Sequence, residues 1–394
     1  MAQDFRSINE LKLNGRRVFV RVDLNVPLSD GRVTDDTRIR ASLPTIKQAL
    51  ERKARIALAS HLGRPKGQVK PELSLEPVGV RLAEILGCEV LLTDDCVGDG
   101  ARKVVNDLRE GQIALLENLR FHAEEQANDE TFARELAQMV DVYVNDAFGA
   151  AHRAHASVSA LPRVMKDKGI GLLMEKEIAA LNRIRTSAPR PFVAVLGGAK
   201  VSDKIGIIEA LLERVDSLLI GGAMANTFLA AGGLDLGKSK IESEKLALAR
   251  SLMAKADDRD VQLLLPVDLV VAESSDVTEG RAVAAEQVPE QCMALDVGPE
   301  TVKRFKEKIL RANAVFWNGP LGMFEREPFA AGTIQTARHV ADCSGFTVVG
   351  GGDSLAAINR SGLADHIDHV STGGGASLEF LEGRLMPGLE AMKS

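Results

Sequence analysis

Two glycine-rich stretches near the C-terminal end of the chain have the residue types that bind phosphate groups. Residues 368–380 read DHVSTGGGASLEF, in which a short strand-forming run meets three glycines and then residues that suit a helix. Residues 346–359 repeat the pattern, with glycines at 350–352 followed by Asp353. A glycine bend exposes its backbone, and the first N–H groups of a helix have no internal partners, so each stretch can face an anion. Together they predict one polyphosphate site.

A third glycine turn carries two lysines. Residues 192–204 contain an apolar run, a Gly-Gly turn, and then Lys200 and Lys204, which would lie one turn apart on one face of a helix. An ordinary surface pair with Asp203 is the alternative. Because phosphoryl transfer depends on positioning and on positive charge near the moving group, we expect both lysines to contact phosphate.

Polar and basic side chains follow the predicted strands of the first half of the chain, where the second half carries glycines. The carboxyl ends of parallel strands share one sheet edge, so these side chains would meet there. Arg38 could instead be a solvated first-turn arginine, and Arg64 could form a loop salt bridge. Their common location favours one site for a small anion. The candidates are Asp23, Asn25, Arg38, His61, Arg64, Asn118, Arg120, Asn145, Asp146, His152 and Arg153.

Two apparent motif matches point elsewhere and are rejected. The tract HRAH at 152–155 resembles a zinc ligand set, but it has no carboxylate or cysteine at ligand spacing, so neutral or hydrogen-bonded histidines are favoured. Residues 232–239, GGLDLGKS, fit the phosphate-loop pattern GxxxxGK[ST]. A true phosphate loop follows a buried strand, whereas this one follows a predicted helix over 224–231, whose end the two glycines would cap.

Three single residues near the glycine loops allow two interpretations each. Asp353 could cap the helix that follows it, or bind Mg²⁺, which takes one or two carboxylates together with phosphate oxygens. Glu325 could accept hydrogen bonds from a ribose or be a surface charge. Trp317, the single tryptophan, is expected in the core rather than stacked on a base.

Short apolar runs alternate with helical segments along the whole chain. Continuously apolar runs of this length indicate parallel strands that are covered on both faces. The predicted fold class is therefore α/β, with two doubly wound parallel-sheet, Rossmann-like domains separated by a cleft. The predicted strands are 18–22, 56–59, 90–92, 113–116, 140–144, 192–196, 218–220, 263–265, 314–317, 346–349 and 369–371.

Length and composition limit the class of protein. A chain of 394 residues predicts two domains, which we place at 1–170 and 171–380, joined by a helix over 171–185. The tail, 381–394, is too apolar for an unattached end. A net charge of −6 argues against a nucleic-acid partner. The four cysteines show no ligand spacing, the N-terminus lacks a signal-peptide core, and no apolar run could span a bilayer, which predicts a cytoplasmic protein.

Taken in order, the motifs resemble those of the phosphoglycerate kinase family. They span nearly the whole chain in the family order, which makes the resemblance far more specific than any single glycine motif. The matching segments are RVDLNVP (21–27), SHLGRP (60–65), ENLRF (117–121), AHRAHAS (151–157), GGAKVSDK (197–204), WNGPLGMFE (317–325), GGGDS (350–354) and STGGGA (371–376).

The resemblance implies a monomeric enzyme that transfers a phosphoryl group between MgATP and 3-phosphoglycerate after domain closure. The N-terminal domain would bind 3-phosphoglycerate, the C-terminal domain would bind ATP or ADP, and the tail would return to the N-terminal domain. Ser354 departs from the threonine common in the family but keeps the hydroxyl. The resemblance implies substrate binding by Asp23, Asn25, Arg38, His61, Arg64, Arg120 and Arg153; nucleotide binding by Lys204, Asn318, Glu325, Gly351, Gly352, Asp353 and Ser354; Mg²⁺ at Asp353; and stabilisation of the transferred group by Arg38, Lys200, Lys204, Gly373, Gly374 and Gly375.

Two other classes of protein use similar parts. A nicotinamide dehydrogenase would also have two α/β halves, but it should carry GxGxxG in a first strand-to-helix turn with an acidic residue about 20 positions further on, and no stretch has that context. A binding module without catalysis could use the same basic sheet edge. Formation of ADP from MgATP and 3-phosphoglycerate separates the kinase from both.

Overall fold

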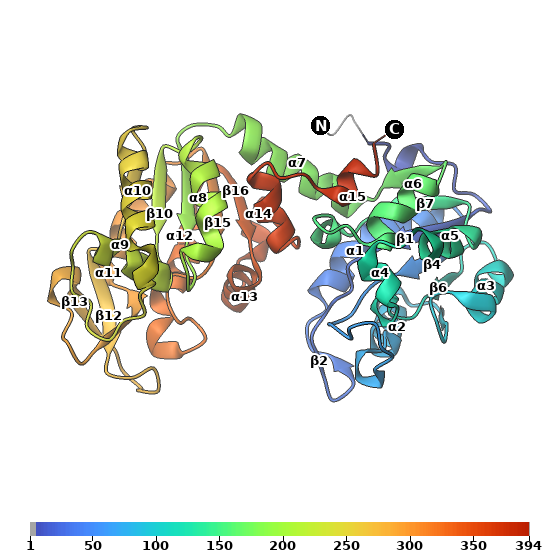
Figure 1. The fold of residues 1–394 in the computed structure, drawn as a ribbon, viewed down its shortest axis with the longest axis horizontal. Helices are drawn as coiled ribbons and strands as arrows, with labels where there is room; N and C mark the ends of the chain where they lie inside the picture. The colour runs from blue at the N-terminus through green and yellow to red at the C-terminus, as the bar shows by residue number, and fades with distance from the viewer. Residues whose placement is uncertain (1–4, 394) are drawn as a thin grey trace. The chain divides into compact units, whose positions relative to one another are not determined.

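The computed structural model describes residues 5–393, which divide into two compact units (Figure 1). Unit 1 comprises the described chain up to Ala179 together with the segment from Leu385 onward, and unit 2 comprises Ala180–Arg384. Helix α7 (Leu172–Ser187) contains the point where the first unit gives way to the second. Each unit is built on its own six-stranded parallel sheet, which confirms the predicted α/β class.

The sheet of unit 1 has the strand order β5-β6-β4-β1-β7-β8. Every neighbouring pair is parallel, as predicted from the continuously apolar runs. The last strand, β8, was not predicted, because a three-residue run beginning with a lysine gives little periodic signal. The strands are β1 (Arg17–Arg21), β4 (Arg55–Ala59), β5 (Val90–Leu92), β6 (Ile113–Leu115), β7 (Val142–Asn145) and β8 (Lys168–Ile170).

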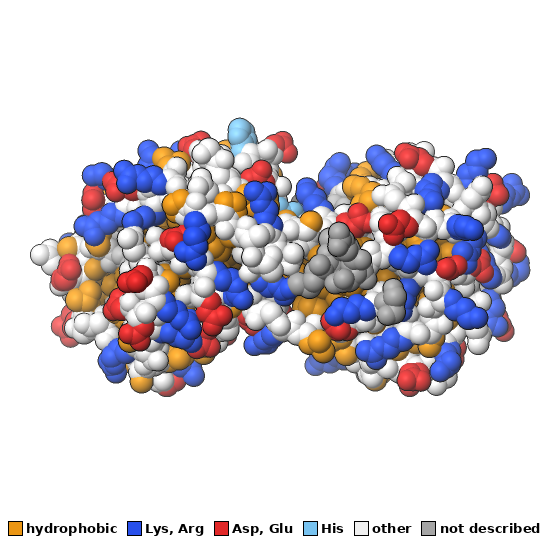
Figure 2. All heavy atoms as spheres, turned by 90° about the horizontal axis from the view of Figure 1, so that it is seen from above, with side chains coloured by type: hydrophobic (Ala, Val, Ile, Leu, Met, Phe, Trp, Pro, Cys, Tyr) orange, Lys and Arg blue, Asp and Glu red, His pale blue; other side chains and the backbone are white. Residues whose placement is uncertain are grey.

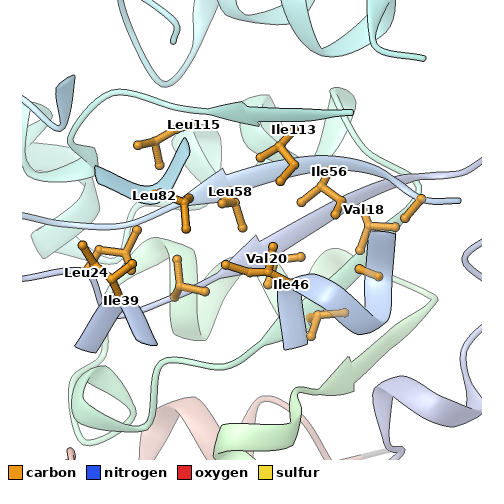
Figure 3. Close-up of a cluster of buried hydrophobic side chains, with 14 of the residues drawn as sticks. Val18, Val20, Leu24, Ile39, Ile46, Ile56, Leu58, Leu82, Ile113 and Leu115 are labelled. Atoms are coloured by element: carbon orange, nitrogen blue, oxygen red, sulfur yellow. The ribbon is translucent and has the colours of Figure 1, made fainter. Parts of the chain in front are cut away.

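Alternate residues of the central strands build the core of unit 1 against two helices (Figure 3). Val18 pairs with Ile56 in register, so their side chains leave the sheet on the same face. Ile39 and Ile46 of helix α1 (Thr37–Glu51) pack on that face, and both are fully buried. Burial of such aliphatic side chains contributes about 1.5 to 3 kcal/mol each.

Unit 1 also contains a small hairpin and further helices. A hairpin of two-residue strands, β2 (Leu28–Ser29) and β3 (Arg32–Val33), was not predicted, since two residues cannot show a period. The remaining helices are α2 (Glu76–Leu86), α3 (Gly98–Asp107), α4 (Ala123–Ala127), α5 (Glu130–Gln138) and α6 (Leu161–Val164), with a π-helical turn, η6 (Ala156–Ala160), before α6.

The sheet of unit 2 has the order β11-β10-β9-β15-β16-β17. Trp317 is fully buried in its core, as predicted, and its indole nitrogen donates to the Gly319 carbonyl at 2.8 Å. The strands are β9 (Phe192–Leu196), β10 (Ser217–Ile220), β11 (Gln262–Leu264), β15 (Ala314–Asn318), β16 (Phe346–Gly350) and β17 (His369–Val370). The helices are α8 (Ile205–Leu212), α9 (Gly222–Ala231), α10 (Leu246–Asp257), α11 (Pro299–Leu310), α12 (Ala331–Ala341), α13 (Gly352–Ser361) and α14 (Gly375–Leu381).

Unit 2 also contains a three-stranded antiparallel sheet that was not predicted. Strand β12 (Asp268–Ala272) lies between β13 (Arg281–Ala284) and β14 (Met293–Val297). Several of its residues are only half-buried, and β12 shifts register against β14 between Val270 and Val271. The strands do contain apolar runs, such as LVVA at 269–272, but this stretch was not assigned to a strand from the sequence.

The C-terminal segment belongs to unit 1. Helix α15 (Pro387–Glu390) lies against η6, and the Gly388 N–H donates to the Ala151 carbonyl at 2.8 Å (Figure 1). The Lys168 ammonium donates to the Ala391 carbonyl at 3.0 Å. Leu389 and Met392 are buried, which accounts for the apolar character of the tail.

The surface carries mixed charge. On the face seen in Figure 2, basic and acidic side chains alternate over both units. Over residues 5–393, no helix combines the length and the apolar character that crossing a bilayer requires.

Leu389→Ala should destabilise the protein by about 2 kcal/mol, because it removes a buried side chain that helps to anchor the tail. Urea unfolding followed by circular dichroism measures the loss. Leu385→Ala is the matched control: Leu385 is 72% exposed, so the change should stay within about 0.5 kcal/mol. Equal losses in the two variants would mean that burial of Leu389 contributes nothing particular.

Candidate functional site

The unit 1 candidates lie where the order of strands in the sheet reverses. From β1 the chain builds the sheet outward through β4 on one side and through β7 on the other, so β1 and β7 flank the switch point. Open parallel sheets bind ligands outside the carboxyl ends of their strands at such a point. Asp23 and Asn25 follow β1, and His61 follows β4.

Hydrogen bonds connect Asp23, Asn25, Arg38 and Arg120, in part through the backbone of Gly63. Arg38, in the first turn of α1, donates to the Asp23 carboxylate at 3.1 Å and to the Asn25 carbonyl at 3.2 Å. The Asn25 side chain accepts from the Gly63 N–H at 2.9 Å, and the Gly63 carbonyl accepts from Arg120 at 2.6 Å. Arg38 is therefore held at the sheet edge, and the interpretation of a solvated first-turn arginine is wrong.

Arg120 is a buried cation with unused hydrogen-bond donors. It lies in the 3₁₀ turn η4 (Leu119–Phe121) and is 3% exposed. Among the described residues its Nε and Nη2 atoms have no partner. Burial, with further contributions from Arg153 and Arg21, lowers the pKa of Arg120 to about 10. Buried donors nearly always have acceptors in proteins, so this guanidinium is suited to bind an anion that enters the site.

The nearby histidines are neutral. Burial, followed by the charges of Arg21 and Arg120, lowers the pKa of His61 well below its usual value. Burial likewise lowers the pKa of His155 to about 3. Within the described chain the one side-chain cluster with metal-ligand spacing is Asp95, Cys96 and His122, which includes neither histidine.

Arg64 and Arg153 complete the predicted set with little support from neighbours. Arg64 is exposed and makes no hydrogen bond or ion pair within residues 5–393, so the predicted alternative of a loop salt bridge is not observed. Arg153 donates from Nε to the His152 ring at 3.1 Å. Arg153 also lowers the pKa of Arg120, which indicates that the two guanidinium groups share one electrostatic environment.

In unit 2 the switch point lies between β9 and β15, and backbone occupies it instead of side chains. Gly198 follows β9 with a φ of +114°, and Gly319 follows β15 with a φ of +96°. Gly222, which opens α9, has a φ of +67°, and a Cβ atom there would lie 2.6 Å from the Gly198 N and O atoms. Glycine is required because these loops pack backbone against backbone.

The Lys204 side chain makes its hydrogen bonds at this switch point of the unit 2 sheet. Its ammonium donates to the Asn318 carbonyl at 3.1 Å and also bonds the Asn318 side chain, which in turn donates to the Gly350 carbonyl at 2.8 Å. Burial lowers the pKa of Lys204 to about 8, against the opposing effect of Asp353 and Asp203. The lysine therefore links the strand ends of β15 and β16.

Lys200 and Lys204 do not lie on one α-helix, which corrects the prediction. Lys200 is exposed in the loop, and Lys204 ends a 3₁₀ turn, η7 (Ser202–Lys204), before α8 begins. Glu242 holds this turn: its carboxylate accepts from the Val201 N–H at 2.5 Å and from the Ser202 hydroxyl at 2.5 Å. Glu242 was not among the predicted residues, because it lies about forty residues from this turn in sequence, in a loop with no motif.

The loop after β16 presents an acidic side chain to solvent. Gly351, with a φ of +95°, is the N-cap of α13, and Asp353 lies exposed in the first turn without a hydrogen bond in the described chain. The interpretation of Asp353 as an N-cap is therefore wrong. Ser354 is fully buried and accepts from the Gly319 N–H at 2.6 Å, so its hydroxyl supports the neighbouring loop.

An apolar cavity of about 400 Å³ adjoins these loops. Glu325 and Asp353 line it, together with Gly198 and Gly222. Much of its apolar wall comes from β14 and from the turn after β15, in particular Met293, Leu295, Pro320 and Leu321. The β14 residues were not predicted as part of a site, because that strand was not predicted.

Residues 373–375 form an open backbone turn between β17 and α14. Gly374 has a φ of +56°, and a Cβ atom on Gly374 or Gly375 would meet no atom within 4 Å. Within the described chain no hydrogen bond joins these glycines, or Lys200, to the cluster around Lys204. The phosphate-loop match at 232–239 follows helix α9, as predicted, and Gly233 has a φ of +97° just beyond the helix end.

Comparisons with known proteins agree along the whole chain. A family model described as phosphoglycerate kinase matches residues 8–384. Proteins named phosphoglycerate kinase from Anaeromyxobacter dehalogenans and Pelotomaculum thermopropionicum are 55% and 51% identical to this chain, and each alignment covers 98% of both proteins. The solved structure of phosphoglycerate kinase from Coxiella burnetii matches with a TM-score of 0.88 at 41% identity, covering 98% of both chains, and that from Pyrococcus horikoshii matches with 0.84 at 35%.

The protein has two doubly wound sheets, one with basic side chains and one with glycine loops at its switch point. With the family model and the relatives, this makes it an α/β phosphotransferase whose acceptor is a carboxyl group. The chain belongs to the phosphoglycerate kinase family. The activity of the protein is therefore phosphoglycerate kinase activity, which belongs to glycolysis and gluconeogenesis. The two alternatives, a dehydrogenase and a binding module without catalysis, are excluded.

Gly222→Ala should destabilise the protein by about 2 kcal/mol more than Gly362→Ala and should weaken ADP binding. Gly362 is a matched control because its φ of +68° equals that of Gly222 within a degree, yet a Cβ atom there meets nothing within 4 Å. Both variants place an alanine in the left-handed backbone region and are strained by it, but only the Cβ atom of Gly222→Ala would push two loops apart. Urea unfolding and calorimetric ADP titration measure the two effects; equal behaviour would contradict the close backbone approach.

Proposed function

We propose that the chain transfers a phosphoryl group reversibly between MgATP and the carboxylate of 3-phosphoglycerate, with 1,3-bisphosphoglycerate and ADP as the products. Family membership supports the reaction. The observation that carries the acceptor site is Arg120, a buried guanidinium with two unpartnered donors next to Arg153 and Arg21. A small anion with several oxygens would satisfy those donors.

The 3-phosphoglycerate site is assigned to unit 1. The phosphate and carboxylate of this substrate need several donors and few competing acceptors, which the sheet edge supplies. Asp23 and Asn25 orient Arg38 and the Gly63 loop. The proposed ligands are Asp23, Asn25, Arg38, His61, Arg64, Arg120 and Arg153.

The nucleotide site is assigned to the glycine loops of unit 2. The apolar cavity suits the base, with Glu325 on its wall as a ribose acceptor, and the start of α13 suits the phosphates. Asp353 fits Mg²⁺, because it is an exposed carboxylate without a hydrogen bond at the helix end that would face the phosphates. Mg²⁺ would neutralise phosphate charge there. The proposed nucleotide ligands are Lys204, Asn318, Glu325, Gly351, Gly352, Asp353 and Ser354.

Transfer requires charge compensation and little proton chemistry. The acceptor carboxylate is already ionised at neutral pH, so no general base is needed. The obstacle is repulsion between two anions, which positive side chains and backbone N–H groups offset. We assign this role to Arg38, Lys200, Lys204 and the backbone of Gly373, Gly374 and Gly375. Direct in-line transfer would follow closure of the two domains, which excludes water that could otherwise accept the phosphoryl group.

The proposal also includes the location, the oligomeric state and the partners of the protein. We propose a cytoplasmic monomer whose partners are 3-phosphoglycerate and ATP or ADP, with neither nucleic acid nor membrane among them. The net charge of −6 supports the absence of a nucleic-acid partner.

Arg38→Ala should lower kcat for ADP formation from MgATP and 3-phosphoglycerate by about 10² to 10³, while ATP affinity stays nearly unchanged, because the guanidinium would stabilise the moving group. A coupled assay and an ATP titration measure the two quantities. Arg40→Ala is the control: Arg40 lies on the same helix, but its side chain is 56% exposed and pairs with Asp36, so its kcat should match wild type. Equal losses of turnover and ATP affinity in Arg38→Ala would contradict the role.

Lys204 should give kcat/KM for ATP an alkaline limb. Burial lowers its pKa from 10.5 to about 8, so the ammonium is charged below that pH and neutral above it. Since kcat/KM reports the ionisation of the unliganded enzyme, the value should fall as pH rises through about 8. Lys204→Arg keeps its charge and should remove the alkaline limb even if its activity is lower. An unchanged limb in that variant would assign the titration to another group.

A further inference from the structure

A buried chain of hydrogen bonds connects His61 to side chains in the interior of unit 1. Arg21, the last residue of β1, is fully buried and therefore has no surface to offer a ligand. Its Nε donates to the Ser157 hydroxyl at 2.8 Å, and its Nη1 donates to the Val22 carbonyl at 2.5 Å. Its Nη2 lies 3.1 Å from Nδ1 of His61. All of its hydrogen bonds are made inside the protein.

The direction of the last hydrogen bond follows from the chemistry of arginine. A guanidinium has donors on all three nitrogens and no acceptor, so Nδ1 of His61 must accept. A neutral imidazole with an accepting Nδ1 carries its single proton on Nε2. We propose that Arg21 is a positioning residue that holds His61 as the Nε2–H tautomer, so that the neutral ring donates a hydrogen bond to an oxygen of the bound acceptor substrate.

The other hydrogen bonds of this chain, around Ser157 and Glu125, hold Arg21 in place. Because the Ser157 hydroxyl accepts from Arg21, its proton is directed to the Glu125 carboxylate, 2.6 Å away. The Ser157 N–H donates to the other Glu125 oxygen at 2.8 Å, and the Tyr143 hydroxyl donates to the Ser157 carbonyl at 2.8 Å. Glu125 is fully buried and lies 4.0 Å from Arg21, so it balances the charge that Arg21 brings into the core.

The remaining ring nitrogen of His61 is available to a ligand. Within residues 5–393 the one hydrogen bond of the ring is that to Arg21, and His61 retains 5% exposure. Burial and the surrounding arginines hold the pKa of His61 low, which keeps the ring neutral. The opposite tautomer would aim Nδ1–H at a guanidinium and a bare nitrogen at an anion, so both contacts would be repulsive.

The tautomer can be read directly on the wild-type protein, and a variant is needed only to assign the signal. A two-bond ¹H–¹⁵N spectrum of the ¹⁵N-labelled chain at neutral pH should show the Nε2–H pattern for His61. The chain has seven histidines, and the signal missing in His61→Gln assigns the residue. An Nδ1–H pattern or an imidazolium pattern would overturn the proposal.

Two variants test whether Arg21 causes the effect. Arg21→Gln can accept as well as donate, so His61 should become a mixture of tautomers, and KM for 3-phosphoglycerate should rise about tenfold while KM for ATP stays within about twofold. Arg21→Lys retains a pure donor and should restore the Nε2–H pattern and most of the affinity. A pure Nε2–H signal in a folded Arg21→Gln would overturn the role of Arg21.

The inference rests on the proposed acceptor site, and the two can fail separately. Addition of 3-phosphoglycerate to the wild-type protein should shift the Nε2 signal of His61. A correct tautomer whose signal does not move would overturn the substrate contact, and with it the place of His61 in the proposed site. A wrong tautomer, in an enzyme whose signal moves and which forms ADP, would overturn only the positioning role of Arg21.

Discussion

Positive charge taken out of water is the constraint on which unit 1 depends. An isolated buried cation is expensive, and proteins tolerate it only with a counter-charge and satisfied donors. Arg21 meets both conditions through Glu125 and Ser157, whereas Arg120 is left with two donors unused. The neighbouring histidines stay neutral under the same field. The attraction for anions is thus concentrated at one sheet edge, where hydrogen bonds to the Gly63 backbone connect Asn25 and Arg120.

Unit 2 solves the opposite problem with the same sheet architecture. Its strand ends carry glycines, so the backbone of one loop lies directly against the backbone of the next. A surface of N–H groups without side chains can approach phosphates closely, and it brings no charge that must be compensated in the empty state. Lys204 is the exception, and it is tied to Asn318. The two sheets therefore differ in chemistry because different residue types follow equivalent strands.

Much of this arrangement could be predicted from the sequence, and the failures have physical causes. The parallel strands were recognisable because both faces are covered, and candidates such as Asp23 and Asn318 were recognisable because they lie at the carboxyl ends of those strands. Strands β12 to β14 were not predicted although they contain short apolar runs, since a short run by itself does not distinguish a strand from a buried helix or loop. The cavity wall at Met293 and Leu295 was missed with them. Glu242 and Arg21 could not be assigned, since their importance arises from contacts between distant segments.

The placement of the C-terminal segment has a consequence for how the chain is made. Unit 1 is discontinuous: its final piece, from Leu385 onward, is hydrogen-bonded to Ala151 and Lys168. A ribosome synthesises all of unit 2 between the two pieces, so unit 2 has its complete sequence while unit 1 still lacks its last helix. Unit 1 therefore reaches its final structure only after the whole of unit 2 has been synthesised. A chain that stops before α15 would leave the part of unit 1 beneath that helix uncovered.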